Sequence, residues 1–349
     1  MNAPYIQQET EGVLRIIRLD RPKALNALSL EMLTQLEHAL NDALADDAIE
    51  AVWLESASER AFCAGGDVKA LALAVDEQTD NAQKQALART YFELEYRIDL
   101  QIEHYEKPLV VFANGLVMGG GWGLYAGAQL KLCTERAVFA MPENQIGFYP
   151  DVGAAEFLQR PDWKQGTFLA LSGMTLSAVE AVALNYVDAI VEEDYARVLK
   201  QSLSQGLSLT DLDLETADTS IDECAQQWRT ALSRLPDNAT LTDWINLVEQ
   251  NAGEYDCFMR TEQMWQSASP WSLALTWEYF RQMRGASRRE VLTADTEMGA
   301  RLSTHPDFYA GVHAKLINKN NEPEWHYPHT ESVPLEDVLE VLNVDSDRK

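Results

Sequence analysis

The sequence has few cysteines and few basic residues, and each shortage argues against a class of protein. Its four cysteines are Cys63, Cys133, Cys224 and Cys257, and they form no CxxC pair and no cluster with histidine at zinc-ligand spacing. We therefore expect reduced thiols, no structural metal and a cytoplasmic location. Only 28 Lys and Arg residues stand against 55 Asp and Glu in 349 residues, a formal net charge of −27. Such a surface repels nucleic acid and anionic membranes, so we expect neither as a partner.

The sequence also lacks a clear membrane-spanning run. The N-terminal residues 1–18 mix polar and charged side chains and contain no apolar signal core, so no export signal is expected. Residues 108–130 carry no charge and are nearly long enough to cross a bilayer. The run nevertheless contains Pro108, Asn114, Gln129 and several glycines, which favours a buried segment of loop and helix in a folded core.

Strand and helix patterns alternate in the first part of the chain. Residues 13–19 and 50–55 are short, apolar and β-branched, as strands are, and they flank an amphipathic helix over 29–45 that Ser29 is placed to cap. A long helix over 80–104 and strands over 109–112 and 131–133 follow in the same way. This alternation predicts an α/β core.

The character of the sequence changes after about Val191, where the strand patterns stop. Helical stretches follow at 193–206, 220–233, 239–252, 256–268, 271–284 and 287–303. We therefore predict a core over residues 1–200 and a helical C-terminal region over 201–349. No internal repeat and no low-complexity segment is convincing.

Small residues gather in three segments where backbone N–H groups could face a ligand. These are Ala64–Asp67, Met118–Gly123 and Met141–Gly153. Glycine allows positive φ and close approach to the backbone, so a pair of such amides can form an oxyanion site. Tight turns and close helix packing would explain the same glycines without a ligand.

One of these segments also matches a dinucleotide-binding pattern. Residues 121–126 read GWGLYA, and Glu143 follows Gly123 by 20 residues. The context is poor, because Glu143 comes after a proline instead of ending a strand, and because residues 115–118 separate the glycines from the preceding strand. The context therefore argues against a dinucleotide site.

The signatures of serine-triad and zinc-peptidase chemistry are missing, since there is no GxSxG and no HExxH. His313 is expected to be a surface or packing residue. Carboxylates remain for acid–base work, and Glu143 and Asp151 flank an apolar stretch, 146–150. An apolar setting disfavours the charged form of a carboxylate, which suits proton transfer. Taken alone, Glu143 could equally cap a helix or turn.

Taken together, the motifs resemble the crotonase (enoyl-CoA hydratase/isomerase) superfamily, and within it the 3-hydroxyisobutyryl-CoA hydrolases. The resemblance covers nearly the whole chain, is weakest over about 205–255, and extends to the tail at 307–319. The segments that carry it are Arg21–Leu28, Ala61–Val68, Met118–Gly123 and Met141–Gly153. It implies a crotonase-like spiral of ββα turns that binds an acyl-CoA thioester.

The resemblance also implies roles for individual residues. The N–H groups of Gly66 and Gly120 would form an oxyanion hole that polarises the thioester carbonyl. Hydratases of the superfamily usually carry a glutamate at the position of Gly123 and another in the Pro-Glu motif. Here only Glu143 remains, and Asp151 is added in a Pro-Asp-Val-Gly motif similar to that of the hydrolases.

Two further residues match the family's substrate-binding positions. Glu95 corresponds to a helix glutamate of the hydrolases that would position the acyl group, although a surface ion pair would also account for it. Lys69 lies on the family's CoA side, although a solvated helix lysine is an equal alternative. Asn144 replaces the usual Thr, Tyr149 replaces a Phe, and residues 154–155 are both alanine, so the acyl-group preference is open.

The function expected from this resemblance is hydrolysis of a short 3-hydroxyacyl-CoA thioester, 3-hydroxyisobutyryl-CoA in valine breakdown. No cofactor is needed, because CoA belongs to the substrate, and a homo-oligomer, a trimer or hexamer, is implied by the family. Whether Glu143 is a nucleophile or a general base stays open. The alternatives are a hydratase or isomerase on the same fold and a non-catalytic CoA-binding scaffold.

Overall fold

The computed structural model describes residues 4–214, 223–320 and 322–342. The chain divides into two compact units, each assembled from three stretches. The first, the sheet unit, comprises Met1–Asp67, Leu94–Ala140 and Thr175–Ile221. The second, the helical unit, comprises Val68–Glu93, Met141–Met174 and Asp222–Lys349. The units interleave along the sequence, and the predicted division at residue 200 stays a prediction.

The sheet unit contains every strand of the described residues. Its strands are β1 (Ile6–Glu11), β2 (Leu14–Leu19), β3 (Ala51–Ser56), β4 (Ala61–Cys63), β5 (Leu109–Ala113), β6 (Leu116–Met118), β7 (Leu130–Cys133), β8 (Val138–Ala140), β9 (Leu176–Ser177) and β10 (Ala189–Ile190). Its helices are α1 (Leu30–Ala45), α4 (Gly120–Ala126), α7 (Ala178–Ala183), α8 (Glu193–Ser204) and the C-terminal part of α3 (Asn81–Glu103), with short 3-10 turns η1 (Pro22–Ala24) and η3 (Leu209–Asp211).

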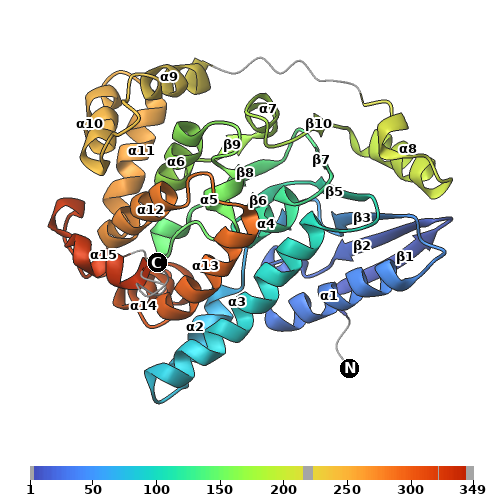
Figure 1. Cartoon of the computed structure of the whole chain (residues 1–349), viewed down its shortest axis with the longest axis horizontal. Coiled ribbons are helices and arrows are strands. Elements are labelled where there is room, and N and C mark those ends of the chain that lie inside the picture. Colours follow the sequence, from blue (N-terminus) through green and yellow to red (C-terminus); the bar gives the residue numbers. More distant parts are fainter. Residues whose placement is uncertain (1–3, 215–222, 321, 343–349) are drawn as a thin grey trace. The chain divides into compact units, whose positions relative to one another are not determined.

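The strands form two sheets, and from β3 to β8 successive strands alternate between them (Figure 1). The larger sheet has the order β1-β2-β3-β5-β7-β10, and the smaller has the order β4-β6-β8-β9. Neighbours are parallel except in the pairs β1–β2 and β8–β9. Each of the consecutive pairs β3–β4, β5–β6 and β7–β8 places one strand in each sheet, and a helix follows. The predicted spiral of ββα turns is confirmed.

Amphipathic helices cover the larger sheet of this unit. On α8, Ala196, Leu199 and Leu203 join a buried cluster with Trp53 and Phe112 of the sheet, as helical spacing requires. Helix α1 begins as expected, with the Ser29 hydroxyl accepting a hydrogen bond from the Met32 N–H at 3.2 Å.

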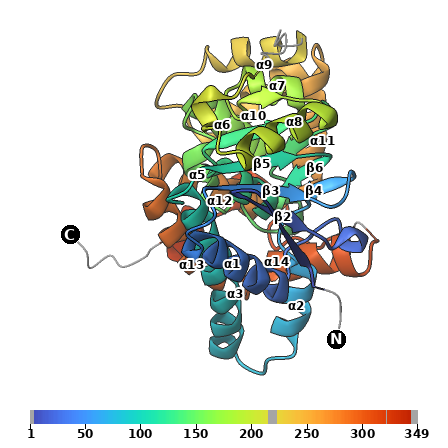
Figure 2. The same ribbon diagram turned by 90° about the vertical axis from the view of Figure 1, so that its right-hand side faces the viewer.

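The helical unit consists of helices and short turns. They are α2 (Val68–Asp76), the N-terminal part of α3, η2 (Glu143–Ile146), α5 (Ala154–Phe157), α6 (Trp163–Ser172), α9 (Glu223–Leu232), α10 (Leu241–Ala252), α11 (Asp256–Ser267), α12 (Pro270–Gln282), α13 (Arg288–Leu302), α14 (Pro306–Val312), the π-turn η4 (His313–Ile317), η5 (Thr330–Ser332) and α15 (Leu335–Leu342). Helices α9 and α10 both pack on α11, as Figures 1 and 2 show from two directions. Around the turn η2, α12 and α14 make direct contacts.

The helices predicted after Val191 are confirmed to within a few residues, except that residues 220–222 lie outside the described part of the chain. The uncharged run 108–130 folds as β5, β6 and α4, and no described helix is both long and apolar enough to span a membrane. His313 is partly buried, and its Nε2 lies 2.8 Å from Asp76 Oδ2.

Candidate functional site

Two backbone amides of the sheet unit lie close together on neighbouring loops. Gly66 follows β4, and Gly120 follows β6 and begins α4. A β-carbon built on Gly120 would lie 3.3 Å from the Gly66 amide nitrogen. Neither N–H group donates a hydrogen bond to any other residue among those the structure describes. Two adjacent amides without protein acceptors are the arrangement that an oxyanion requires.

The Arg21–Leu28 segment holds the first of these amides in place. The Leu28 N–H donates to the Gly65 carbonyl at 2.9 Å, and the Asp67 N–H donates to the Leu28 carbonyl at 2.9 Å. The buried Asn26 side chain donates to the Phe62 carbonyl at 2.9 Å. Hydrogen bonds therefore fix the peptide groups on either side of Gly66. They connect the Arg21–Leu28 motif to the Ala61–Val68 motif.

Arg21 adds an ion pair to the same contact. Its Nη1 lies 2.7 Å from Asp67 Oδ2 and also donates to the Ala27 carbonyl at 2.7 Å. Both side chains are mostly buried. Because Arg21 belongs to one motif and Asp67 to the other, the ion pair links the two motifs directly.

Glu95 lies beside the second amide. It comes from α3, its exposed fraction is 2%, and a β-carbon on Gly120 would overlap its Oε1 atom. Glu95 is therefore a buried residue and not a surface one. Its carboxylate is placed where it can contact a group bound at the two amides.

Gly121, the next glycine of α4, serves packing. A β-carbon on Gly121 would overlap the Cys63 carbonyl of β4, so glycine is needed for the close approach of helix and strand. Gly123 is buried in α4 and offers no carboxylate. Glu143 begins the 3-10 turn η2 and does not end a strand, so the dinucleotide interpretation is not supported.

Glu143 lies in the helical unit, in a turn that its neighbours fix. The Asn144 side chain donates to the Ala170 carbonyl at 2.8 Å and accepts from the Thr276 hydroxyl at 2.8 Å. A β-carbon on Gly147, at the end of the turn, would overlap the Asp307 backbone. Asn144, noted above as a departure from the family pattern, thus ties η2 to α6 and α12.

The Glu143 carboxyl is buried, with an exposed fraction of 8%. Its Oε2 atom accepts no hydrogen bond from the described residues. Burial raises the pKa of Glu143 well above its usual value, and the charge of Asp151 raises it further. A buried carboxyl with an available oxygen and a raised pKa is suited to accepting a proton.

Asp151 lies in the loop between η2 and α5 and is 6% exposed. This loop contains two successive residues with positive φ, Val152 at 53° and Gly153 at 82°. The Gly153 N–H donates to Asp295 Oδ2 at 2.8 Å. Both predicted carboxylates are therefore buried in the helical unit, while Gly66, Gly120 and Glu95 belong to the sheet unit.

Asp295 is a residue of this site that the sequence analysis missed. It lies on α13, is fully buried, and accepts hydrogen bonds from the Tyr149 hydroxyl at 3.0 Å and the Tyr279 hydroxyl at 2.6 Å. Burial is the main cause that raises the pKa of Asp295 to about 6. The available signal was its spacing, because Arg288, Val291 and Asp295 recur on the apolar face of that helix.

Lys69 is an exposed side chain on α2 of the helical unit, and it forms no ion pair with a described residue. Its predicted contact with CoA stays a prediction. The structure describes no group of three or more His, Cys, Asp or Glu side chains placed to hold a metal ion.

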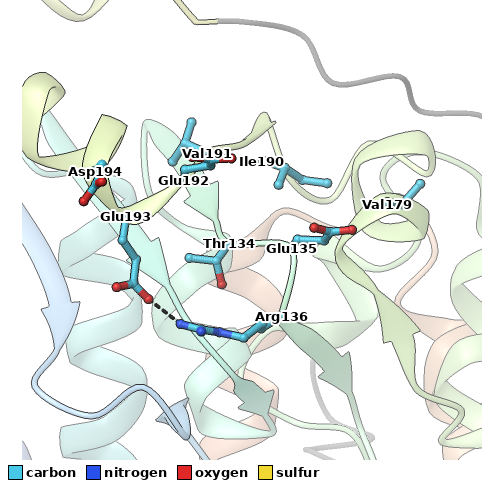
Figure 3. Close-up of a pocket in the computed structure, with 9 residues that line it drawn as sticks. All are labelled: Thr134, Glu135, Arg136, Val179, Ile190, Val191, Glu192, Glu193 and Asp194. Atoms are coloured by element: carbon cyan, nitrogen blue, oxygen red, sulfur yellow. Dashed lines mark hydrogen bonds and ion pairs between the residues drawn. The ribbon is translucent and has the colours of Figure 1, made fainter.

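A hollow of about 610 Å³ in the sheet unit is unsuited to a polyanion (Figure 3). Its lining includes Glu135, Glu192, Glu193 and Asp194, and its one basic residue, Arg136, is ion-paired with Glu193. Because the remaining charge is negative, this hollow is not a candidate for binding CoA.

Comparison with known proteins agrees with this architecture. A structure titled an enoyl-CoA hydratase from Rhodobacter sphaeroides superimposes with a TM-score of 0.87 and 28% identity over 97% of each chain. A Danio rerio protein named 3-hydroxyisobutyryl-CoA hydrolase, mitochondrial, is 32% identical over 91% of this chain and 84% of its own. A Neurospora crassa protein named small ribosomal subunit protein mS47 is 30% identical over 92% of this chain and 67% of its own.

The sequence profile of one family spans almost the whole chain. Residues 14–342 match the profile described as enoyl-CoA hydratase/isomerase, a range that takes in the paired amides, both buried carboxylates and α13. The match also crosses the middle helices at about 205–255, where the sequence motifs were weakest. The chain belongs to the enoyl-CoA hydratase/isomerase family, that is, to the crotonase superfamily, and has its fold.

Proposed function

We propose that the protein is an enzyme that hydrolyses a short 3-hydroxyacyl-CoA thioester, with 3-hydroxyisobutyryl-CoA, an intermediate of valine breakdown, as its substrate. The name of the Danio rerio relative supports this reaction. The observation that carries the proposal is the buried Glu143 carboxyl, which has an available oxygen and lies beside Asp151. The absence of a carboxylate at Gly123 separates the chain from the hydratase pattern.

In the proposed reaction, the Gly66 and Gly120 N–H groups donate hydrogen bonds to the thioester oxygen and stabilise the charge that develops there. Glu143 then acts in one of two ways. As a nucleophile it attacks the carbonyl carbon, the C–S bond breaks, and water hydrolyses the resulting anhydride. As a general base it takes a proton from the attacking water, and the tetrahedral intermediate expels the thiolate, which is then protonated.

Two further carboxylates complete the proposal. Asp151 transfers a proton or accepts a hydrogen bond from the 3-hydroxyl of the acyl group. Glu95, beside Gly120, positions the acyl group. No cofactor enters either route.

Binding of the CoA part needs local positive charge, because the chain carries a net charge of −27. The exposed Lys69 is the proposed contact. A cytoplasmic location and a trimeric or hexameric assembly remain parts of the same proposal.

A free-thiol assay over a panel of short acyl-CoA esters tests the reaction. We expect CoA release from 3-hydroxyisobutyryl-CoA to exceed release from isobutyryl-CoA. Release from neither ester by the folded wild-type protein would contradict the proposal.

A non-catalytic role is the second candidate, because the Neurospora crassa relative is named as a ribosomal protein. The paired amides and the buried Glu143 and Asp151 argue against it, since a scaffold does not need them. The two candidates differ in one measurement: a scaffold would bind CoA esters or a protein partner without releasing thiol.

A further inference from the structure

The loop that carries Asp151 has a backbone conformation that its own sequence disfavours. Val152 has a φ of 53° and Gly153 has a φ of 82°. A β-branched residue at positive φ is an outlier that persists only where surrounding contacts impose it. Something outside the loop must therefore hold this turn.

Asp295 supplies that contact from α13. Its Oδ2 accepts the Gly153 N–H at 2.8 Å, and its Oδ1 accepts the Tyr149 and Tyr279 hydroxyls. Tyr149 is two residues before Asp151 and Gly153 two residues after it. One fully buried carboxylate thus binds both sides of the residue that the proposed mechanism uses.

Arg288 also lies against this turn, next to Gly153. A β-carbon on Gly153 would lie 3.4 Å from both Cγ and Nε of Arg288, and the Arg288 guanidinium lies 5.7 Å from the centre of the Phe157 ring. Arg288 also favours the charged form of Asp295. Asp295 is therefore oriented by two tyrosine hydroxyls and the Gly153 N–H, as a rigid support requires.

We propose that Asp295 is a positioning residue that fixes the Asp151 carboxylate for the reaction, through Gly153 and Tyr149. The inference rests on the proposed function. An apolar residue would fill the core at this place without the desolvation of a carboxylate, so a packing role alone does not explain Asp295. Its two oxygens satisfy three donors, and two of these belong to the residues that flank Asp151.

A double-mutant cycle tests the proposal. If Asp295 acts by placing Asp151, then Asp295→Ala should lower kcat by about 10- to 100-fold, the scale expected for a misplaced group. Adding it to Asp151→Asn should then lower kcat by less than about threefold, because Asp151 is already disabled. Independent roles would multiply the two losses, and that result would overturn the inference.

The control is Leu302→Ala on the same helix. Leu302 is fully buried like Asp295 and lies about two turns further along the helix. Its effect should multiply with that of Asp151→Asn, and measured melting temperatures show how much each variant destabilises the fold. A non-additive result with Leu302→Ala as well would show that the cycle reports stability, and would also count against the inference.

Asp295→Asn provides the conservative variant. An asparagine can accept the Gly153 N–H with its oxygen and donate to the tyrosine hydroxyls with its amide, so kcat should recover to within about fivefold of wild type. Should Asp295→Ala be insoluble, Tyr279→Phe takes its place in the cycle, with an expected loss of about two- to fivefold, as for one hydrogen bond.

The outcomes separate the two proposals. A wild-type protein that releases no thiol contradicts the proposed function and this inference with it. An active wild type in which Asp295→Ala and Asp151→Asn lose activity multiplicatively contradicts this inference alone. Non-additive loss, with recovery in Asp295→Asn, supports it.

Discussion

A single methyl group added at Gly120 tests whether the paired amides bind the reacting oxygen. In Gly120→Ala the β-carbon would lie 3.3 Å from the Gly66 amide nitrogen. An oxyanion oxygen has to come within about 2.7–3.1 Å of that nitrogen, so the methyl group occupies the space that the oxygen needs. We expect kcat to fall by about 10²–10³, which is the loss typical of one oxyanion donor, or about 2.7–4 kcal/mol.

The fold is expected to survive this change. The atom that the methyl group overlaps, Glu95 Oε1, is the end of a side chain and not part of the backbone. Gly121→Ala is the contrasting variant, because there the overlap is with the Cys63 backbone, which cannot move without shifting β4. Gly121→Ala should therefore lower the melting temperature more than Gly120→Ala does.

The assay is thiol release from 3-hydroxyisobutyryl-CoA at saturation, together with a thermal melt of each variant. Gly253→Ala is the neutral control, since nothing lies within 4 Å of its β-carbon position. If Gly120→Ala melts like wild type and keeps kcat within about threefold, the reasoning about the amides is refuted.

The remaining predictions concern the carboxylates and the reaction class. Glu143→Gln should lower turnover by at least about 10² while CoA-ester affinity, measured by calorimetry, changes only a few-fold; normal turnover would make Glu143 structural. Since Asp151 raises the pKa of Glu143, Asp151→Asn should move the acid limb of kcat/KM to lower pH, and an unmoved or rising limb would contradict the coupling. Chelators should leave the rate unchanged, whereas loss restored by a divalent ion would indicate a metal. Crotonyl-CoA hydration, followed by enoyl absorbance, should be negligible beside thiol release, because Gly123 supplies no carboxylate.

Local sequence patterns predicted the elements that carry strong periodicity. Helix α13 spans Arg288–Leu302 where 287–303 was expected, because its apolar residues recur at three and four positions. Strand β1 was missed because its sequence, IQQETE, is polar and exposed in five of six positions at the edge of the sheet. Strands β9 and β10 have two residues each, too few to form a pattern.

The same distinction applies to the candidate site, where some residues belong to local sequence motifs and others do not. The paired amides and the Glu143 and Asp151 carboxylates lie in segments whose residue order was informative. The contact between Gly153 and Asp295 joins residues 142 positions apart, and no local pattern encodes such a pair. An aspartate on an apolar helix face is a local conflict of the kind that functional sites retain, and it would have been the signal to follow.

The buried carboxylates of the helical unit oppose folding as they ionise. Each has to lose hydration, and raised pKa values show that the fold favours the protonated forms of Glu143 and Asp295. For an acid with a raised pKa, the folded state binds more protons than the unfolded state between the two pKa values. Stability therefore falls as pH rises from the unfolded value, through about 6 in the case of Asp295. Neutral groups at these positions would not carry this cost, so the presence of the carboxyls beside a strained turn at Val152 is better explained by chemistry at this loop than by packing.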